Sequence, residues 1–126
     1  MSRLLPAVAA TLLALPTALL LPPLALVPVA QAQEMADSRL RAANLARMEA
    51  ERLNGGLSRY NTAACMHQRG GGDCLVRDDQ DGYLFTFLGG VPGWQALGKP
   101  ASVETTILIS PDGRDVLQVQ YNGAPR

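Results

Sequence analysis

The clearest pattern in the chain is an apolar block at its start, followed by helical and then strand-like spacing. Leu4–Leu26 is almost wholly apolar and follows the short positive start Met1-Ser2-Arg3. Ala30-Gln31-Ala32 then has the small-x-small form of a cleavage site. The pattern predicts a cleavable signal peptide over residues 1–32 and a single small exported domain over residues 33–126.

An uncleaved membrane anchor is the alternative, because the apolar block is long enough to cross roughly 30 Å of hydrocarbon. Prolines interrupt this block, and each interior proline costs a helix about 3 kcal/mol. They are Pro6, Pro16, Pro22, Pro23 and Pro28. We therefore expect cleavage, with no stable membrane insertion afterwards. The first cysteine is Cys65, so the cleavage point lacks the cysteine of a lipoprotein.

Behind the leader, good helix formers without proline or glycine predict a helix over Ala36–Leu53. Asp37 or Ser38 can cap its start, and Asn54-Gly55-Gly56 can end it. An apolar series with three-four spacing continues through the glycines and predicts a second short helix over Leu57–Met66, after a bend or break. The series is Ala43, Ala46, Ala50, Leu53, Leu57, Tyr60 and Ala64.

Short β-type runs separated by turn residues fill the remainder and predict three or four antiparallel strands. The runs are Cys74–Arg77, Tyr83–Leu88, Val103–Ser110 and Val116–Tyr121. Asp78–Gly82 and Ser110–Arg114 are polar turns between them, and the second predicts a hairpin of the last two strands.

Alternation within each run predicts which side chains face the core. The second run places three aromatic residues on one face and Leu84, Thr86 and Leu88 on the other. The third places Val103, Thr105, Ile107 and Ile109 on the core face. For the closing strand, the alternation predicts Leu117, Val119 and Tyr121 inward, with Gln118 and Gln120 outward.

Two cysteines complete the fold prediction. Cys65 and Cys74 are the only two cysteines, and the chain is predicted to be exported. An even number of cysteines in an exported chain favours a disulfide. Gly70-Gly71-Gly72 makes the intervening loop pliable, and closing a loop of about ten residues stabilises a fold by roughly 2–3 kcal/mol. The sequence thus predicts an α+β fold: an N-terminal helix packed on a small sheet of three or four antiparallel strands, with one short-range disulfide.

Length and charge narrow the function. Removing 32 of 126 residues leaves 94, enough for one small domain. Without Arg3, ten basic residues face eleven acidic ones, so the net charge is −1. Nucleic acid is not predicted as a partner, because binding it calls for a basic excess on one face.

The residues between the cysteines raise the question of a metal site. Cys65, His67, Asp73 and Cys74 are all side chains that bind metals, but their spacing matches no usual paired-ligand pattern, and His67 is the single histidine. Serines occur at caps, turns and strand ends, where backbone bonding explains them. We expect no catalytic residue, no cofactor and no metal. A small metal-binding or hydrolytic protein centred on His67 is one alternative.

The connection over Gly89–Pro100 holds the only tryptophan, Trp94. Connections of this length are often functional or packed on themselves. Trp94 is either buried against the helix or sheet, or exposed as an anchor for a partner, since aromatic residues commonly carry interface energy. Trp94 is therefore the candidate partner surface.

The order of a helix, a small sheet and a disulfide behind an apolar segment is similar in outline to a type IV pilin subunit. Pilin precursors are cut before the apolar segment, after a glycine, whereas Met1-Ser2-Arg3-Leu4 contains none. The resemblance implies a self-assembling structural subunit as the other alternative. Our main expectation is an exported, non-catalytic domain of the periplasm or the secreted space. It would bind a protein or small ligand through the Trp94 loop or the mixed face of the sheet.

Overall fold

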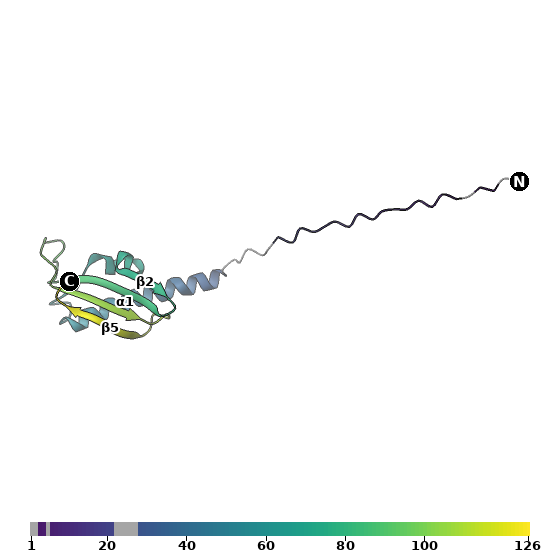
Figure 1. The fold of residues 1–126 in the computed structure, drawn as a ribbon. Helices are drawn as coiled ribbons and strands as arrows, with labels where there is room; N and C mark the ends of the chain where they lie inside the picture. Colours follow the sequence, from purple (N-terminus) through teal and green to yellow (C-terminus); the bar gives the residue numbers. More distant parts are fainter. Residues whose placement is uncertain (1–2, 5, 22–27) are drawn as a thin grey trace.

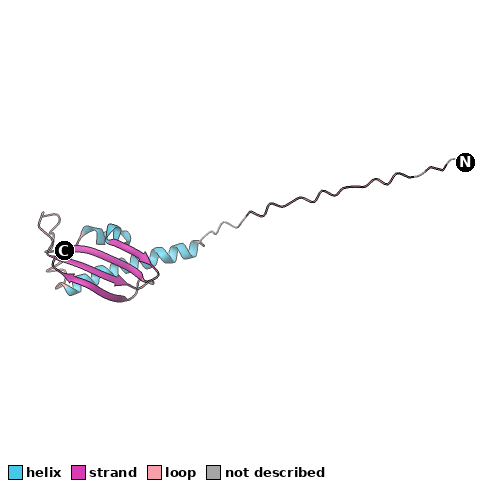
Figure 2. Cartoon of the chain, in the orientation of Figure 1, coloured by secondary structure: helices cyan, strands magenta, loops and turns pink. Residues whose placement is uncertain are grey.

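The structure is a computed structural model that describes residues 3–4, 6–21 and 28–126. Residues 6–21 form neither helix nor strand. The remaining leader positions, with Pro22 and Pro23 of the predicted signal peptide, lie outside the described residues. The folded part is one long helix behind a five-stranded antiparallel sheet, with two 3-10 helices beside it (Figures 1 and 2).

The long helix α1 spans Val29–Leu53 and so begins earlier than predicted. Pro28 precedes it, and the Ala, Gln, Glu and Met residues that follow are helix formers like those of the predicted span. The predicted capping role of Asp37 or Ser38 is wrong, because both lie inside the helix. The predicted end is confirmed: the helix stops at Leu53, and Gly55 has a φ of 96°, in the left-handed region that favours glycine.

The predicted second helix over Leu57–Met66 is wrong. The glycine pair reverses the chain, and the next elements are strand β1 (Asn61–Thr62) and the 3-10 helices η1 (Ala64–His67) and η2 (Arg69–Cys74). The apolar series misled because only its first members share a buried helix face, and Leu57 is exposed. Tyr60 is buried by a different route, between the helix and the sheet.

The sheet contains β2 (Leu75–Asp79), β3 (Gly82–Gly90), β4 (Val103–Ile109) and β5 (Val116–Gly123) besides β1. Their order is β1-β3-β4-β5, and β2 also pairs with β3. Because β4 pairs along one edge of β3, the short strands β1 and β2 share its other edge. The predicted α+β class is confirmed, with five strands instead of three or four because two strands occupy one sheet position.

The disulfide between Cys65 and Cys74 is confirmed, with the two Cα atoms 5.8 Å apart. It joins η1 to the end of η2 and thereby closes the excursion that the chain makes between β1 and β2. Gly71 in this loop is buried, and a Cβ there would lie 2.6 Å from the Phe85 ring. The loop glycines therefore allow close packing as well as pliability.

The core lies between α1 and one face of the sheet. Alanines of α1 meet the aromatic face of β3 and the inner face of β4, both of which were predicted correctly. The principal core residues are Ala42, Ala43, Ala46, Ala50, Tyr60, Met66, Tyr83, Phe85, Phe87, Ile107 and Ile109.

The predicted facing of the closing strand is wrong for two of its three residues. The pairing of β4 with β5 shifts register twice, once between Thr106 and Ile107 and again between Leu108 and Ile109. Each bulge inserts a residue and reverses the alternation that follows it. As a result Val119 pairs with Ile107 on the inner face, Leu117 falls in a bulge and is 52% exposed, and Tyr121 lies opposite Thr106 on the outer face.

Candidate functional site

The sheet face turned away from α1, called here the open face, is the largest feature that the fold leaves unexplained. Helix α1 and the η1–η2 loop all pack on the opposite face, and no element of the described chain covers the open face (Figures 1 and 2). Side chains that alternate with the core residues of β3 and β4 therefore point into solvent. Their burial is only partial.

Three cross-strand rows make up the open face. The first joins two leucines to a glutamine, the second carries hydroxyl groups, and the third holds the only carboxylate among them. The rows are Leu84–Leu108–Gln118, Thr86–Thr106–Tyr121 and Leu88–Glu104–Gly123. In the second row the hydroxyls of Thr86 and Thr106 are 3.1 Å apart and share a hydrogen bond. Beside the first row, Arg77 of β2 pairs with Leu84 and forms an ion pair with Asp79. The three rows themselves are uncharged except at one corner.

That corner, the Glu104 corner, consists of Glu104, Tyr121, Gly123 and Arg126. The backbone N–H of Arg126 donates to Glu104 Oε2 at 2.9 Å, and its Nη2 and Nε donate to Oε1 at 2.9 and 3.3 Å. The guanidinium carbon also lies 3.6 Å from the centroid of the Tyr121 ring. A single carboxylate thus accepts three N–H groups from one residue, while an aromatic ring lies against the same guanidinium.

A glycine in β5 leaves room for the ring of Tyr121. A Cβ at Gly123 would lie 3.2 Å from the Tyr121 hydroxyl oxygen, so the absence of a side chain there lets the ring lie along the strand. The Tyr121 hydroxyl then donates to the carbonyl oxygen of Ala124 at 2.6 Å. Residues 124–126 consequently turn back over the open face instead of leaving it.

The two charged side chains of this corner differ in how far they are exposed to solvent. The side chain of Glu104 is 12% exposed, whereas that of Arg126 is 57% exposed. The backbone N–H of Arg126, followed by its guanidinium, holds the pKa of the Glu104 carboxyl below its usual value. Glu104 is thus an ionised acceptor set into the sheet surface, and Arg126 is a cation resting on it.

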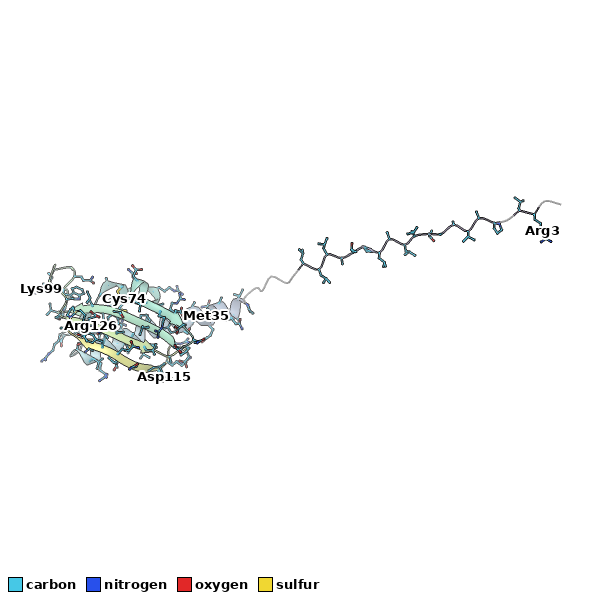
Figure 3. All side chains as sticks on the ribbon, viewed as in Figure 1. Arg3, Met35, Cys74, Lys99, Asp115 and Arg126 are labelled. Carbon is cyan, nitrogen blue, oxygen red and sulfur yellow. A yellow bond between two sulfur atoms is a disulfide. The ribbon has the colours of Figure 1, made fainter. Side chains whose placement is uncertain are left out.

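The structure places Trp94 in the interior of its loop. The residue is 8% exposed, and its indole N–H donates to the carbonyl oxygen of Asn61 at 3.1 Å. The large apolar side chains that this loop exposes are instead Val91 and Leu97. The loop and Arg126 lie at the same end of the sheet, away from Asp115 and Met35 (Figure 3). Trp94 therefore fixes the loop, and any partner of the loop would contact its neighbours first.

His67 lies at the end of η1 beside a shallow hollow of about 230 Å³ whose lining includes Trp94 and Gln95. Its Nε2 is 3.2 Å from Thr62 Oγ1. Gln95 Oε1 accepts a hydrogen bond from the backbone N–H of Ala64 at 2.6 Å. The hollow thus has an aromatic and amide lining, but much of its hydrogen-bonding capacity is used in holding the loop to β1 and η1.

The structure does not assemble the metal-binding or hydrolytic sets considered from the sequence. Both cysteine sulfurs are used in the disulfide, and His67 bonds to a threonine. Ser38 bonds to the Tyr83 hydroxyl, and Ser110 bonds to Asp112. Within residues 3–4, 6–21 and 28–126, no three His, Cys, Asp or Glu side chains are grouped so that they could hold an ion.

Sequence reasoning missed the Glu104 corner. Tyr121 was predicted to face the core, and Gly123–Arg126 received no prediction. The tyrosine, glycine and arginine follow one another within six residues, but nothing in that order shows that the chain turns back onto Glu104. The contact depends on the β5 bulge between Val119 and Tyr121, which places the tyrosine on the face opposite to Val119.

The described helices include none with the length and apolar character needed to span a bilayer. Comparison of the chain with protein-family models, with curated proteins and with solved structures gave no match.

Proposed function

We propose that residues 33–126 form an exported, non-catalytic binding domain of the periplasm or the secreted space, and that its binding surface is the open face. The observation that carries this proposal is the coverage of the sheet on one face only. The other face presents Leu84, Leu88 and Leu108 around a pair of threonines. Contiguous apolar surface of this kind marks interaction sites in soluble proteins.

The disulfide supports export, because cysteine pairs persist in oxidising compartments and are rare in reducing ones. In the full chain the predicted cleavage site lies in the first turns of α1. Cutting after Ala32 would remove only residues 29–32 from the helix, and all of these are exposed. The helix residues that pack on the sheet begin at Ser38, so the domain keeps its core after cleavage.

Mass spectrometry of the protein isolated from the expressing cells tests export. We expect a chain that begins near Gln33, with no thiol open to alkylation before reduction. An intact Met1 terminus, or two free thiols in native material, would contradict export while leaving the binding surface untested.

Site-specific photo-crosslinking tests the binding surface. A benzophenone side chain at Leu84 lies on the open face, and the same group at Met48 lies on the exposed side of α1. We expect a discrete adduct from position 84 and none from position 48. Adducts from both positions or from position 48 alone would contradict the proposal, and an adduct of exactly twice the domain mass would favour the self-assembling subunit.

Point substitution provides a second test of the binding surface, with a matched control. Leu108→Arg places a charge in the first row of the open face, whereas Leu117→Arg places one in the exposed bulge of β5. We expect the adduct from position 84 to disappear with Leu108→Arg and to persist with Leu117→Arg. Equal adducts in the two variants would show that the open face does not make the contact.

A further inference from the structure

We propose that the Glu104 corner is a binding site for an arginine-bearing segment of a partner protein, and that residues 124–126 occupy this site as a built-in competitor. The inference deepens the proposed function, on which it rests, by naming the chemistry that the partner must present. It predicts a short extended peptide ligand with a guanidinium group at a defined position.

The corner has the form of a receptor with a ligand already in place. Glu104 is set into the sheet and 12% exposed, while the Arg126 side chain above it is 57% exposed. Along the described chain, Arg126 is the only hydrogen-bonding or ion-pair partner of the Glu104 side chain. The carboxylate is paired by Arg126 through charge-assisted hydrogen bonds, and any arginine that makes the same contacts can replace the internal one.

The contacts select arginine, not merely a positively charged side chain. The guanidinium lies over the Tyr121 ring and uses two of its nitrogens on one carboxylate oxygen. A planar, delocalised cation can stack and donate in this way, whereas the lysine ammonium is a compact point charge. The second oxygen takes the backbone N–H of the same residue, so the arginine must lie within a peptide chain.

A second backbone contact extends the recognised segment. The Tyr121 hydroxyl donates to the carbonyl oxygen of Ala124, two residues before Arg126. Together the contacts recognise the carbonyl oxygen of one residue and, two residues later, the backbone N–H and the guanidinium of an arginine. The three rows of the open face continue from this corner, so a partner can add apolar contacts that residues 124–126 do not make.

The internal segment favours a foreign partner over a second copy of this chain. A tethered ligand competes at an effective concentration in the millimolar range, which the same segment of another molecule does not reach in dilute solution. Only a partner that also contacts Leu84, Leu88 and Leu108 of the open face can displace the internal arginine. Residues 124–126 thereby restrict the site to ligands with the arginine and the apolar surface together.

Isothermal titration calorimetry with acetyl-Ala-Pro-Arg-amide tests the proposal on the protein as isolated from the expressing cells. Deletion of residues 124–126 empties the site, and Arg126→Ala empties its guanidinium position should the deletion impair folding. We expect both variants to bind the peptide at least about tenfold more tightly than the parent, in which the tethered arginine competes.

Matched controls separate recognition of arginine from general attraction. The same peptide with citrulline keeps the shape but loses the charge, and Glu104→Gln in the deletion variant keeps the site's shape but loses its charge. Both changes are expected to weaken binding at least about tenfold, because they remove the charge-assisted bonds. Glu49→Gln changes another arginine-paired glutamate, on α1, and leaves binding unchanged.

Three results would overturn the inference. The first is absence of peptide binding in folded vacant variants, and the second is equal affinity in the parent and the vacant variants. The third is a parent dimer in size-exclusion chromatography that disappears on deletion, because the ligand would then be a second copy. A persistent crosslink from Leu84 alongside any of these results would leave the broader binding function standing.

Discussion

The ring of Tyr60 lies directly against the backbone of Gly89, so closely that a side chain at position 89 would overlap the ring edge and its hydroxyl. Tyr60 is among the largest fully buried side chains, and Gly89 sits at the end of β3 where β1 joins the sheet. The tyrosine thus occupies the space that a strand residue normally fills. This contact ties the turn after α1 to the edge of the sheet.

Gly89→Ala is expected to lower the free energy of unfolding by about 1–3 kcal/mol, the usual cost of overpacking a core. Without the overlap, alanine would stabilise a strand position relative to glycine, so the sign of the change is informative. Urea denaturation of both proteins measures it. In a Tyr60→Leu background the cost of Gly89→Ala should shrink, and an undiminished cost would show that the tyrosine ring is not its cause.

Tyr60→Phe is expected to raise the free energy of unfolding by about 1 kcal/mol at neutral pH. Its hydroxyl is buried and has no hydrogen-bond partner within the described residues, and a buried unsatisfied group carries a desolvation penalty. Urea denaturation against the parent provides the measurement. A loss of stability would mean that the hydroxyl is bonded in solution.

Alkaline pH should destabilise the parent more than Tyr60→Phe. Burial raises the pKa of Tyr60 to about 12, helped by the negative charge of Glu51 and opposed by the nearby Thr105 hydroxyl. The unfolded chain has the ordinary tyrosine pKa near 10, so it loses the proton first. Stability is then lost as pH rises from about 10 to about 12, by roughly 2–3 kcal/mol at the upper end. Matching pH profiles for the two proteins would refute this assignment.

The hydroxyls of Ser38 and Tyr83 are 2.6 Å apart in the interior and link α1 to β3. We expect Ser38→Ala to cost about 1–2 kcal/mol, because it leaves the buried Tyr83 hydroxyl without its partner, and Tyr83→Phe to cost about 1 kcal/mol, because Ser38 keeps its bond to the Met35 carbonyl oxygen. The double variant should cost less than the sum of the two, with a coupling of about 1 kcal/mol in a double-mutant cycle. Strict additivity would place the two hydroxyls in separate interactions.

Replacing Cys65 and Cys74 together by serine is expected to lower the free energy of unfolding by roughly 2–3 kcal/mol, the value for a loop of this length. Chemical reduction of the parent should produce a similar loss, measured by thermal unfolding with and without reductant. An unchanged free energy of unfolding in the serine variant, or unchanged thermal unfolding of the parent on reduction, would show that the η1–η2 loop is held by packing alone.

Much of the fold follows from local signals that operate over a few residues. The helix end at Leu53 depends on the glycine that follows it, and the facing of β3 and β4 depends on simple alternation. The strand and hairpin predictions held because turn residues separate them. The predicted start of the helix was wrong. The residues from Val29 to the predicted start at Ala36 are also helix formers, and nothing interrupts the helix between Pro28 and that point.

The candidate site could not be predicted from the same signals. Alternation assigned Tyr121 to the same face as Val119, and the bulge between these two residues turns it to the open face. Once there, it accepts Arg126, which reaches back to Glu104 on the neighbouring strand. Bulges depend on how two strands fit together, and a sequence pattern read along one strand contains no information on that fit.

Sequence alone determined the α+β class, the long helix and the pairing of the only two cysteines, because propensity, alternation and residue counts are properties of the chain itself. The tertiary structure decided that Asn61–Thr62 is a strand, that one sheet face stays open, and that Arg126 rests on Glu104. Each of these depends on contacts between residues far apart in sequence, whose formation is settled by packing in three dimensions.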